Sequence, residues 1–374
     1  MAAINLMKEY VTKLDNRFSQ KSLTEAHCGH DYEWDGVNSI IVYTMDNMAV
    51  QDYTLTGANR FTGGVFPTNI GDEANTYTLQ MKRSFGGIIE GVQNMDQKSI
   101  KKANSLLKQT WDEVMVPEID KYRLTTWANG AGKTVINSTA LTNQTIVKQI
   151  LLGQAHLNNK LVGREGRVCF ITETMAVETQ LAAELAYNEA YTSKAIVNGQ
   201  IAKMGGLPIV AIPDDWMPAG VEFMIKYKRS SADPTKLKML RALTQVQGVY
   251  GTVLEGLTRY DSFVMANKAD GIYVYGQSGI TPDVTITVSG GVATLAGASG
   301  NSAIYYTLDG SNPKADRYDA ANTSGARAQY NGSSKPSGLT AGTVIKAYAE
   351  TKPGGVRTKL DSGIVTHVVT AAEA

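Results

Sequence analysis

Residues 97–124 read QKSIKKANSLLKQTWDEVMVPEIDKYRL and contain the longest helical pattern in the chain. Apolar side chains recur every three or four residues, as in Ala103, Leu107, Trp111 and Val114. This spacing places them on one face of a helix, so the segment predicts a long amphipathic helix. Pro117 lies inside the pattern. Because proline lacks a backbone N–H and crowds the preceding turn, we expect it to end or kink the helix.

The region after this helix mixes the helical period with short apolar runs. Apolar residues at helical spacing predict further helices over residues 143–159 and 174–187. Runs rich in Val and Ile predict buried strands over residues 167–172, 207–212 and 221–227. These helices and strands together predict a mixed α/β region.

The region before the long helix has a different character. Residues 51–56 and 75–82 alternate polar and apolar side chains around a centre rich in Gly, Asn and Pro. This pattern predicts a long hairpin-like arm over about residues 50–92. An isolated hairpin is marginally stable in water, so we expect another subunit to cover this arm.

The composition changes near residues 276–279. All four Trp and all seven Phe precede this point, and the later segment is rich in Gly, Ser, Thr and Ala. Asp309-Gly310 is a strong turn signal within the later segment. Alternating apolar residues predict short strands over residues 284–288, 303–308, 343–349 and 363–369. Short strands separated by glycine-containing turns predict a small β-sandwich.

Composition and charge exclude several classes of protein. The formal net charge is +1, whereas a chain whose main role is to grip nucleic acid usually carries a basic face. Cys28 and Cys169 are too few for a disulfide framework and fit a reducing cytosol. The sequence has no apolar run of about 18 residues, and its start lacks the apolar core of a signal peptide. We therefore expect synthesis in a cytoplasm and no membrane partner.

Short motifs suggest chemistry but lack the rest of a site. Residues 130–134 (GAGKT) end like a phosphate-binding loop, but Trp127 stands where that loop needs its first glycine. His27, Cys28 and His30 are metal-ligand types, but no second pair follows at the spacing of a zinc site. No His falls in a recognisable nucleophile motif. We therefore expect no catalytic residue, no cofactor and no metal, and a protein that is not an enzyme.

Three phrases and the order of the elements resemble the coat proteins of tailed bacteriophages. The phrases are residues 116–123 (VPEIDKYR), residues 203–213 (KMGGLPIVAIP) and residues 260–274 (YDSFVMANKADGIYV), the last of which resembles a closing strand pair. The order of arm, extended loop, long helix, mixed region and closing strands is similar to the tailed-phage and herpesvirus capsid fold. The resemblance covers roughly residues 1–277.

This resemblance implies an α+β capsid shell domain over residues 1–277, followed by a small all-β, immunoglobulin-like sandwich over residues 278–374. Within the shell domain we expect five parts in order. They are an arm over 1–49, an extended loop over about 50–92, a spine helix over about 97–124, a central α/β region over about 140–255 and closing strands over 256–277.

The resemblance also implies partners. The chain is expected to assemble with itself into hexamers and pentamers of an icosahedral shell, in the virion capsid, around double-stranded DNA. A separate scaffolding protein and a portal are further expected partners. The spine helix of this fold lies toward the shell interior, so its basic residues are candidates for non-specific DNA contact, with a plain solvated face as the alternative. These residues are Lys98, Lys101, Lys102 and Lys108.

The C-terminal segment has a resemblance of its own. Residues 304–313 (IYYTLDGSNP) and 346–349 (KAYA) resemble the immunoglobulin- or fibronectin-like module at the C-terminus of chitobiase-type glycosidases, an accessory domain without catalytic residues. On a shell this domain would face outward. One of its two adjacent strand tyrosines must point inward and the other outward. Aromatic rings can stack on sugars, so the candidate glycan contacts are Tyr305, Tyr306, Tyr318 and Tyr330.

Two other functions fit parts of the sequence. A bacterial surface or adhesion protein would use the C-terminal sandwich to bind carbohydrate, but should carry a secretion signal and β-repeats. An encapsulin-like compartment shell would use the same fold to enclose cargo enzymes, and a decorating domain would be unusual on it.

Overall fold

The computed structural model describes residues 21–29, 31–32, 39–45, 72–91, 94, 102–182, 200–204, 206–244, 246–277, 279–297, 302–314, 327–351 and 358–374. These residues form two compact units, which are described separately below. The first unit contains the described residues up to 32 and those of 79–264 and 270–280. The second contains those of 39–78, 265–269 and 281–374.

The long helix is confirmed; of the two outcomes expected at Pro117, an end or a kink, the helix does not end there, and a π-helical irregularity immediately precedes the proline. The helix consists of α2 (Ala103–Thr110), a π-helical turn (Trp111–Met115) and α3 (Val116–Asn129). In the π-helical turn, the N–H of Val116 donates to the carbonyl of Trp111, five residues back. Pro117 therefore lies in the first turn of α3, where a proline needs no intrahelical N–H donor. The helix continues past the predicted end at residue 124 to Asn129.

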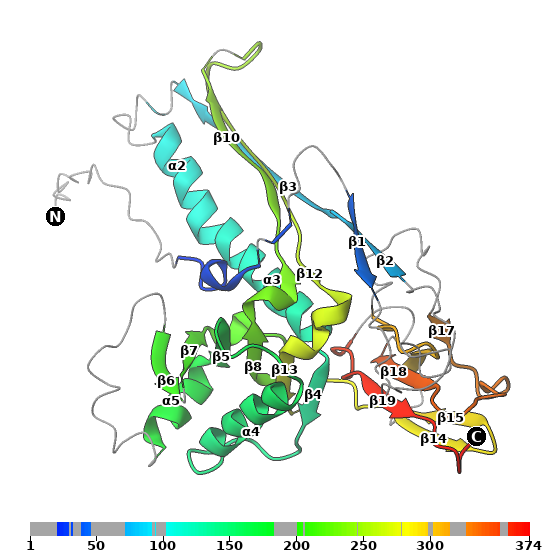
Figure 1. The fold of residues 1–374 in the computed structure, drawn as a ribbon. Coiled ribbons are helices and arrows are strands. Elements are labelled where there is room, and N and C mark those ends of the chain that lie inside the picture. Colours follow the sequence, from blue (N-terminus) through cyan, green and yellow to red (C-terminus); the bar gives the residue numbers. More distant parts are fainter. Residues whose placement is uncertain are drawn as a thin grey trace, which may run out of the picture. The chain divides into compact units, whose positions relative to one another are not determined.

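A three-stranded antiparallel sheet lies beside α2 (Figure 1). Its strands, in spatial order, are β10 (Thr235–Leu243), β11 (Gly251–Tyr260) and β3 (Met81–Glu90). Leu107 of α2 packs against Ile89 and Leu254 in an apolar cluster between helix and sheet. Strand β3 occupies the end of the predicted extended loop, and the hairpin of β10 and β11 was not predicted from the sequence.

A six-stranded mixed sheet forms the centre of the first unit. The three strands predicted within it are confirmed as β5 (Arg167–Thr172), β7 (Leu207–Ile212) and β8 (Val221–Tyr227). Together with β4 (Lys133–Ile136), β13 (Ile272–Gly276) and β6 (Gln200–Met204), they lie in the order β4-β13-β8-β5-β7-β6. Such strands are buried on both faces and read as continuous apolar runs, which explains why the sequence predicted them.

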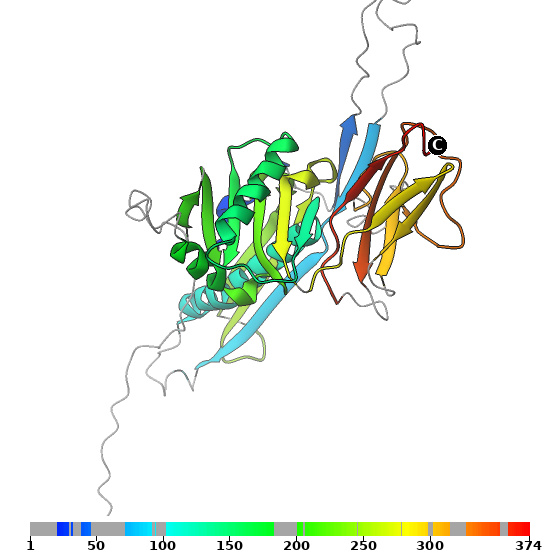
Figure 2. The same ribbon diagram turned by 90° about the horizontal axis from the view of Figure 1, so that it is seen from below.

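Helices cover both faces of this sheet. The predicted helices are confirmed as α4 (Ile146–Asn159) and α5 (Glu173–Leu181), and the residues predicted to extend α5 lie outside the described part. Cys169 and Ile171 of β5 share a buried cluster with α4, whereas Phe170, between them, stacks on Trp127 of α3. Because side chains alternate along a strand, α3 and α4 must lie on opposite faces, as Figure 2 shows.

The predicted closing strands do not pair with each other. Strand β11 pairs with β10 and β3, whereas β13 lies between β4 and β8 in the central sheet. Between β11 and β13 in the sequence lies a short strand, β12 (Phe263–Val264), which pairs with β9 (Ser231–Ala232). Strands β11 and β13 are close in the sequence, which suggested that they pair. The residues between them instead connect the three-stranded sheet to the six-stranded sheet.

The second unit is all-β. It contains the hairpin β14 (Thr285–Ser289) and β15 (Val292–Ala296) and a four-stranded sheet in the order β17-β16-β18-β19. The strands of that sheet are β16 (Ser302–Thr307), β17 (Ala328–Gln329), β18 (Val344–Thr351) and β19 (Val365–Val368). Side chains from the hairpin and the sheet share two buried apolar clusters, and these clusters confirm the predicted sandwich packing.

Local signals in this unit behave as predicted. Val284 and Val288 are buried, and Ile286 packs against the same clusters, so the three share one face. Gly310 follows Asp309 with φ +80°, a left-handed conformation that favours glycine.

The structure describes only part of the predicted hairpin-like arm. The unit contains β1 (Ser39–Met45), paired antiparallel with β2 (Asp72–Thr78). Residues 51–56, predicted as the first strand of the arm, lie outside the described residues.

Candidate functional site

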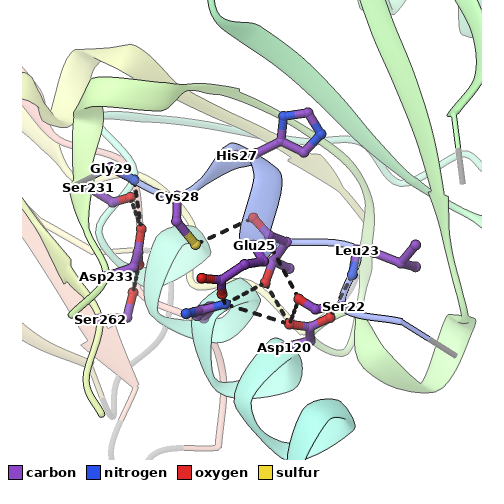
Figure 3. Close-up of polar contacts among 12 residues, drawn as sticks. Ser22, Leu23, Glu25, His27, Cys28, Gly29, Asp120, Ser231, Asp233 and Ser262 are labelled. Carbon is purple, nitrogen blue, oxygen red and sulfur yellow. Dashed lines mark hydrogen bonds and ion pairs between the residues drawn. The ribbon is translucent and has the colours of Figure 1, made fainter. Parts of the chain in front are cut away.

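Buried polar side chains attach the first described segment of the chain, residues 21–29, to the long helix (Figure 3). Asp120 of α3 is fully buried, and its carboxylate accepts three hydrogen bonds from this segment. The donors are the Ser22 hydroxyl at 2.8 Å, the Leu23 backbone N–H at 2.9 Å and the Thr24 hydroxyl at 2.6 Å. A buried carboxylate is stable in the protein when hydrogen bonds replace its lost hydration, and these three supply that replacement.

Arg123 lies one turn further along the same helix and has a second contact with the segment. Its guanidinium is 2% exposed and donates from Nη1 to the Thr24 hydroxyl at 3.2 Å and to the Glu25 carboxylate at 2.5 Å. Residues three apart on a helix share a face, so Asp120 and Arg123 both meet the segment. Their nearest charged atoms are 3.9 Å apart.

A second buried carboxylate, Asp233, lies at the other end of the segment. One of its oxygens accepts from the Trp127 indole N–H at 2.9 Å and from the Ser262 hydroxyl at 2.6 Å. The other accepts from the Ser231 hydroxyl and, at 3.3 Å, from the Gly29 backbone N–H. Asp233 thus joins the segment to the end of α3 and to strands β9 and β12.

Gly29 is required by the close approach of two backbones. A Cβ atom at this position would lie 1.9 Å from the carbonyl oxygen of Ser231, which is far inside van der Waals contact. The carbonyl of Gly29 also accepts from the N–H of Asp233 at 3.2 Å. The segment therefore lies against this edge through its backbone, and any side chain would push it away.

Lys226 places a buried positive charge beneath the segment. Its ammonium group donates to the His27 carbonyl at 2.8 Å and lies 4.1 Å from the centre of the Trp127 ring. Burial lowers the pKa of Lys226. Burial, together with the charges of Lys226 and Lys228, lowers the pKa of His27 to about 4, so its imidazole is neutral at pH 7.

This arrangement can hold a segment in place, and it lacks the features of a catalytic centre. Burial raises the pKa of the Cys28 thiol well above its usual value, which keeps it protonated and unreactive. Among the described residues no three His, Cys, Asp or Glu side chains gather to hold a metal ion. Residues 130–134 follow a helix and enter strand β4, the reverse of the strand-to-helix order of a phosphate loop. We name residues 22–29 with Asp120, Arg123, Lys226 and Asp233 the docking cluster.

Almost nothing in the sequence predicted the docking cluster. The hydrogen bonds between residues 22–29 and the four buried side chains join positions 96 to 204 apart in the sequence, which no local pattern reveals. One usable signal was present: Asp120 and Arg123 lie within the phrase quoted above for residues 116–123. Two opposite charges at this spacing are usually read as a solvated pair, and their burial is visible only in three dimensions.

The structure places two of the four lysines predicted to face DNA. Lys102 immediately precedes α2 and Lys108 lies in its last turn, and both are exposed. Lys98 and Lys101 lie outside the described residues. DNA contact by these side chains stays a prediction.

The tyrosines predicted to contact glycans lie on two faces of the sandwich sheet. Tyr306 meets Tyr330 edge-on, and both pack against the buried cluster that contains Ile304. Tyr305 points to the other face, where it stacks on Tyr348 with ring centres 5.6 Å apart. Tyr318 lies outside the described residues. The structure thus separates Tyr305 from Tyr306 and Tyr330, and glycan binding stays a prediction.

Comparisons with known proteins agree with both units. Residues 294–369 match the family model described as Fn3 associated. No curated protein sequence matches the chain. Solved structures similar to this one include "Mycobacterium phage Che8", with a TM-score of 0.60 and 15% identity over 73% of this chain and 98% of that one.

Two further similar structures carry the word capsid in their titles. The "Capsid structure of the Cyanophage P-SCSP1u" has a TM-score of 0.57 and 11% identity over 73% of this chain and 93% of that one. The "Asymmetric unit of bacteriophage PhiM1 mature capsid" has a TM-score of 0.55 and 9% identity over 74% and 92%. At such identities the likeness defines the fold. This chain has the phage capsid fold with an additional all-β Fn3-associated segment, which confirms the fold class and the resemblance seen in the sequence.

One further feature concerns membranes. None of the helices in the described part of the chain is both long enough and apolar enough to cross a bilayer.

Proposed function

We propose that this chain is the major capsid protein of a tailed bacteriophage, a structural shell subunit and not an enzyme. The observation that carries this proposal is the shared fold, which extends over 98% of the first similar phage chain and 93% of the cyanophage capsid chain. Because a fold can serve several functions, the proposal needs a direct test of assembly.

The subunits assemble into hexamers and pentamers of an icosahedral shell in the virion, around double-stranded DNA. They are synthesised in the cytoplasm of the bacterial host and act with a scaffolding protein and a portal. Exposed apolar residues on the three-stranded sheet support contact with neighbours, because exposed apolar surface often marks an interaction site; two of them, Met239 and Leu257, are direct cross-strand neighbours. The exposed residues are Ile88, Met239 and Leu257, whose side chains are 61%, 43% and 40% exposed.

Electron microscopy of the purified full chain, expressed alone and with its genomic neighbours, tests this function. A matched variant lacks residues 278–374. Uniform shells from both chains, with surface knobs lost on truncation, are the expected result. Monomers or small oligomers under every condition would overturn the proposal and favour the adhesin alternative. Shells that co-purify with enzyme cargo instead of DNA would favour the encapsulin-like alternative.

Non-specific contact with packaged DNA is the second part of the proposal. Replacing Lys102 and Lys108 with Gln removes two exposed positive charges from the long helix. Replacing Lys335 and Lys359 with Gln removes two exposed charges from the C-terminal segment and serves as a control. We expect DNA retention in filled shells to become weaker and less steeply dependent on salt concentration in the first variant alone, because fewer phosphate contacts release fewer counterions. Identical retention in both variants would remove this part of the proposal.

Weak glycan binding by the Fn3-associated segment is the third part. Tyr305 supports it, because its ring stacks on Tyr348 and the guanidinium of Arg327 lies over it, 4.2 Å from the ring centre, so this face of the sheet combines aromatic rings with a hydrogen-bond donor. A glycan array probed with the full chain should show weak binding that Tyr305→Ala abolishes and Tyr250→Ala does not. Tyr250 is a suitable control because it is 67% exposed and lies in the first unit. An array without signal above that of the chain lacking residues 278–374 would contradict glycan binding.

A further inference from the structure

A pocket of about 580 Å³ opens beside the docking cluster in the first unit. One wall is formed by Ala26 and His27 of the docked segment. The other walls come from the end of α4, from the loop that enters β5, from the start of β7 and from the residue after β8. The charged residues in these walls are Arg164, Glu165, Arg167 and Lys228. The volume lies within the range of pockets that hold small ligands or peptide side chains.

Positive charge is in excess around this pocket. Arg164, Arg167 and Lys228 face it with a single carboxylate, that of Glu165. Arg164 and Lys228 are exposed at its mouth, and no carboxylate of the described residues lies within ion-pair distance of either. This excess distinguishes the pocket from an ordinary surface, where charges of both signs are interspersed.

Arg167 supplies a fixed and buried part of this positive charge. The residue is 5% exposed, and its guanidinium donates from Nε to the Gly163 carbonyl at 2.8 Å and from Nη2 to the Val162 carbonyl at 2.6 Å. These two bonds fix the plane of the group, and they leave the Nη1 donors without an acceptor among the described residues. A rigid guanidinium with free donors is well suited to a carboxylate or phosphate.

The lowered pKa values of Arg167 and His27 agree with a positive electrostatic potential in the pocket. Burial and the charge of Arg164 lower the pKa of Arg167. The pKa of His27 is lowered by burial and then by Lys226 and Lys228. For both groups, the neighbouring positive charges thus lower the pKa further than burial alone does.

The remaining walls indicate which kind of anion fits. Leu207 and Pro208 add an apolar surface, and Gln154 and Asn158 add amides that can bond to a peptide backbone. A phosphate ion alone would fill a small part of the volume. Duplex DNA is a poor fit, because its phosphates are bound by extended basic surfaces and this pocket has three basic residues.

We propose that this pocket binds an acidic peptide segment of a partner protein, with its carboxylates at Arg164, Arg167 and Lys228 and an apolar side chain against Leu207 and Pro208. Recognition of acidic motifs by arginine clusters is a recurring mode of peptide binding. This site does not depend on the shell function. Because Ala26 and His27 form one wall, the bound peptide also favours the docked state of residues 22–29 by mass action.

The test uses the full chain and a fluorescent hexapeptide of alternating Glu and Leu, with a Gln-for-Glu peptide as its uncharged control. Fluorescence anisotropy at low salt should show binding of the Glu peptide and at least tenfold weaker binding of the Gln peptide. The double variant Arg164→Gln, Lys228→Gln should bind the Glu peptide about tenfold more weakly, as expected for the loss of two partly solvated ion pairs. Arg229→Gln removes an exposed charge one residue from Lys228 and outside the pocket, and should bind within twofold of the parent.

A second readout follows the docked segment. Alkylation of Cys28, which lies next to the wall residue His27, should slow when the Glu peptide is added to the parent chain, and should not change in the double variant. Alkylation of Cys169 in both chains shows whether the variant keeps its fold. Equal binding of the two peptides, or an equal loss of binding in the control and double variants, would overturn the proposal. Complete displacement of the peptide by millimolar inorganic phosphate would also overturn it and indicate a simple anion site.

Discussion

Replacing Asp120 with Asn should loosen the docked segment while leaving the central sheet intact. The carboxylate accepts hydrogen bonds from Ser22, Leu23 and Thr24, and a buried bond to a charged group contributes about 1.5–3 kcal/mol. An amide can still accept from the Leu23 N–H, but its NH₂ group replaces the oxygen that accepts both hydroxyl protons. Arg123 also loses the negative charge 3.9 Å away. We expect a loss of about 2 kcal/mol of docking free energy for Asn, and about 3–5 kcal/mol for Ala.

The two cysteines of the chain provide the assay. Both are fully buried, but Cys28 lies in the docked segment and Cys169 lies in β5 of the central sheet. Alkylation of Cys28 requires local release of the segment, whereas alkylation of Cys169 requires the sheet to open. When opening and closing are fast, the alkylation rate follows the population of the open state. A loss of about 2 kcal/mol therefore predicts roughly 30-fold faster alkylation of Cys28, measured by mass spectrometry of the peptides.

Glu25→Gln is the matched control for this substitution. It also removes a carboxylate that contacts Arg123, but the Glu25 side chain is 55% exposed. Solvent-exposed ion pairs contribute about 0–1 kcal/mol, so Cys28 should be alkylated less than about fivefold faster. Unchanged alkylation of Cys28 in Asp120→Asn would refute the docking argument. An equal acceleration at Cys28 and Cys169 would show that Asp120 supports the whole unit and not the segment alone.

Three further predictions use single residues. Gly29→Ala should expose Cys28 to alkylation, because its Cβ would lie 1.9 Å from a backbone oxygen; normal protection would show that the two backbones can separate at little cost. Acid should release the same segment. The pKa of His27 is about 4 in the folded chain and near 6.5 in the unfolded chain. Protonation therefore favours release, and docking free energy present above pH 6.5 is lost as the pH falls toward 4. Allowing for its partial exposure, we expect roughly 1–2 kcal/mol. The measurement is the alkylation rate of Cys28 divided by that of a free cysteine peptide at the same pH, because acid lowers the thiolate fraction of every thiol. This ratio should rise at pH 4.5, and His27→Gln should make it less pH-dependent. Gly310→Ala should lower the free energy of unfolding by about 1 kcal/mol, because φ is +80° there. Gly332→Ala is the control and should be nearly neutral, because the space around its Cβ is open. Equal effects of the two substitutions in a thermal unfolding scan would contradict the strain argument.

Local sequence patterns predicted those elements whose burial follows a simple rule. Strands β5, β7 and β8 are buried on both faces and appear as unbroken apolar runs, and the long helix shows a clear apolar stripe. The hairpin of β10 and β11 was missed because its residues face both a helix and solvent. In β10, for example, Leu240 packs toward α2 whereas Met239, on the opposite face, is 43% exposed. Apolar residues on both faces blur the alternation that identifies a strand.

The hydrogen-bond register explains why the helix does not end at Pro117. The rule that Pro117 ends a helix holds when the helix must keep the same hydrogen-bond register on both sides of the proline. Here the π-helical turn inserts one extra residue before it, so the missing N–H falls in the first turn of a new α-helical register. The sequence contains the proline but no readable signal for the π-helical turn.

The docking cluster could not be predicted because its contacts join residues that are far apart in the sequence. The nature of these contacts also suggests a role for the cluster. Buried ion pairs seldom stabilise a fold more than well-packed apolar residues would, because desolvation offsets most of their attraction. Asp120, Arg123 and Asp233 each need partners at defined atoms of residues 22–29, so they favour one position of the segment over all others. We therefore hypothesise that the cluster specifies where the segment lies. In the proposed shell, a segment held in one position would give every copy the same local surface with which to meet its neighbours. The thiol assay can contradict this hypothesis: if Cys28 in Asp120→Asn stays as protected as in the parent, apolar packing alone positions the segment.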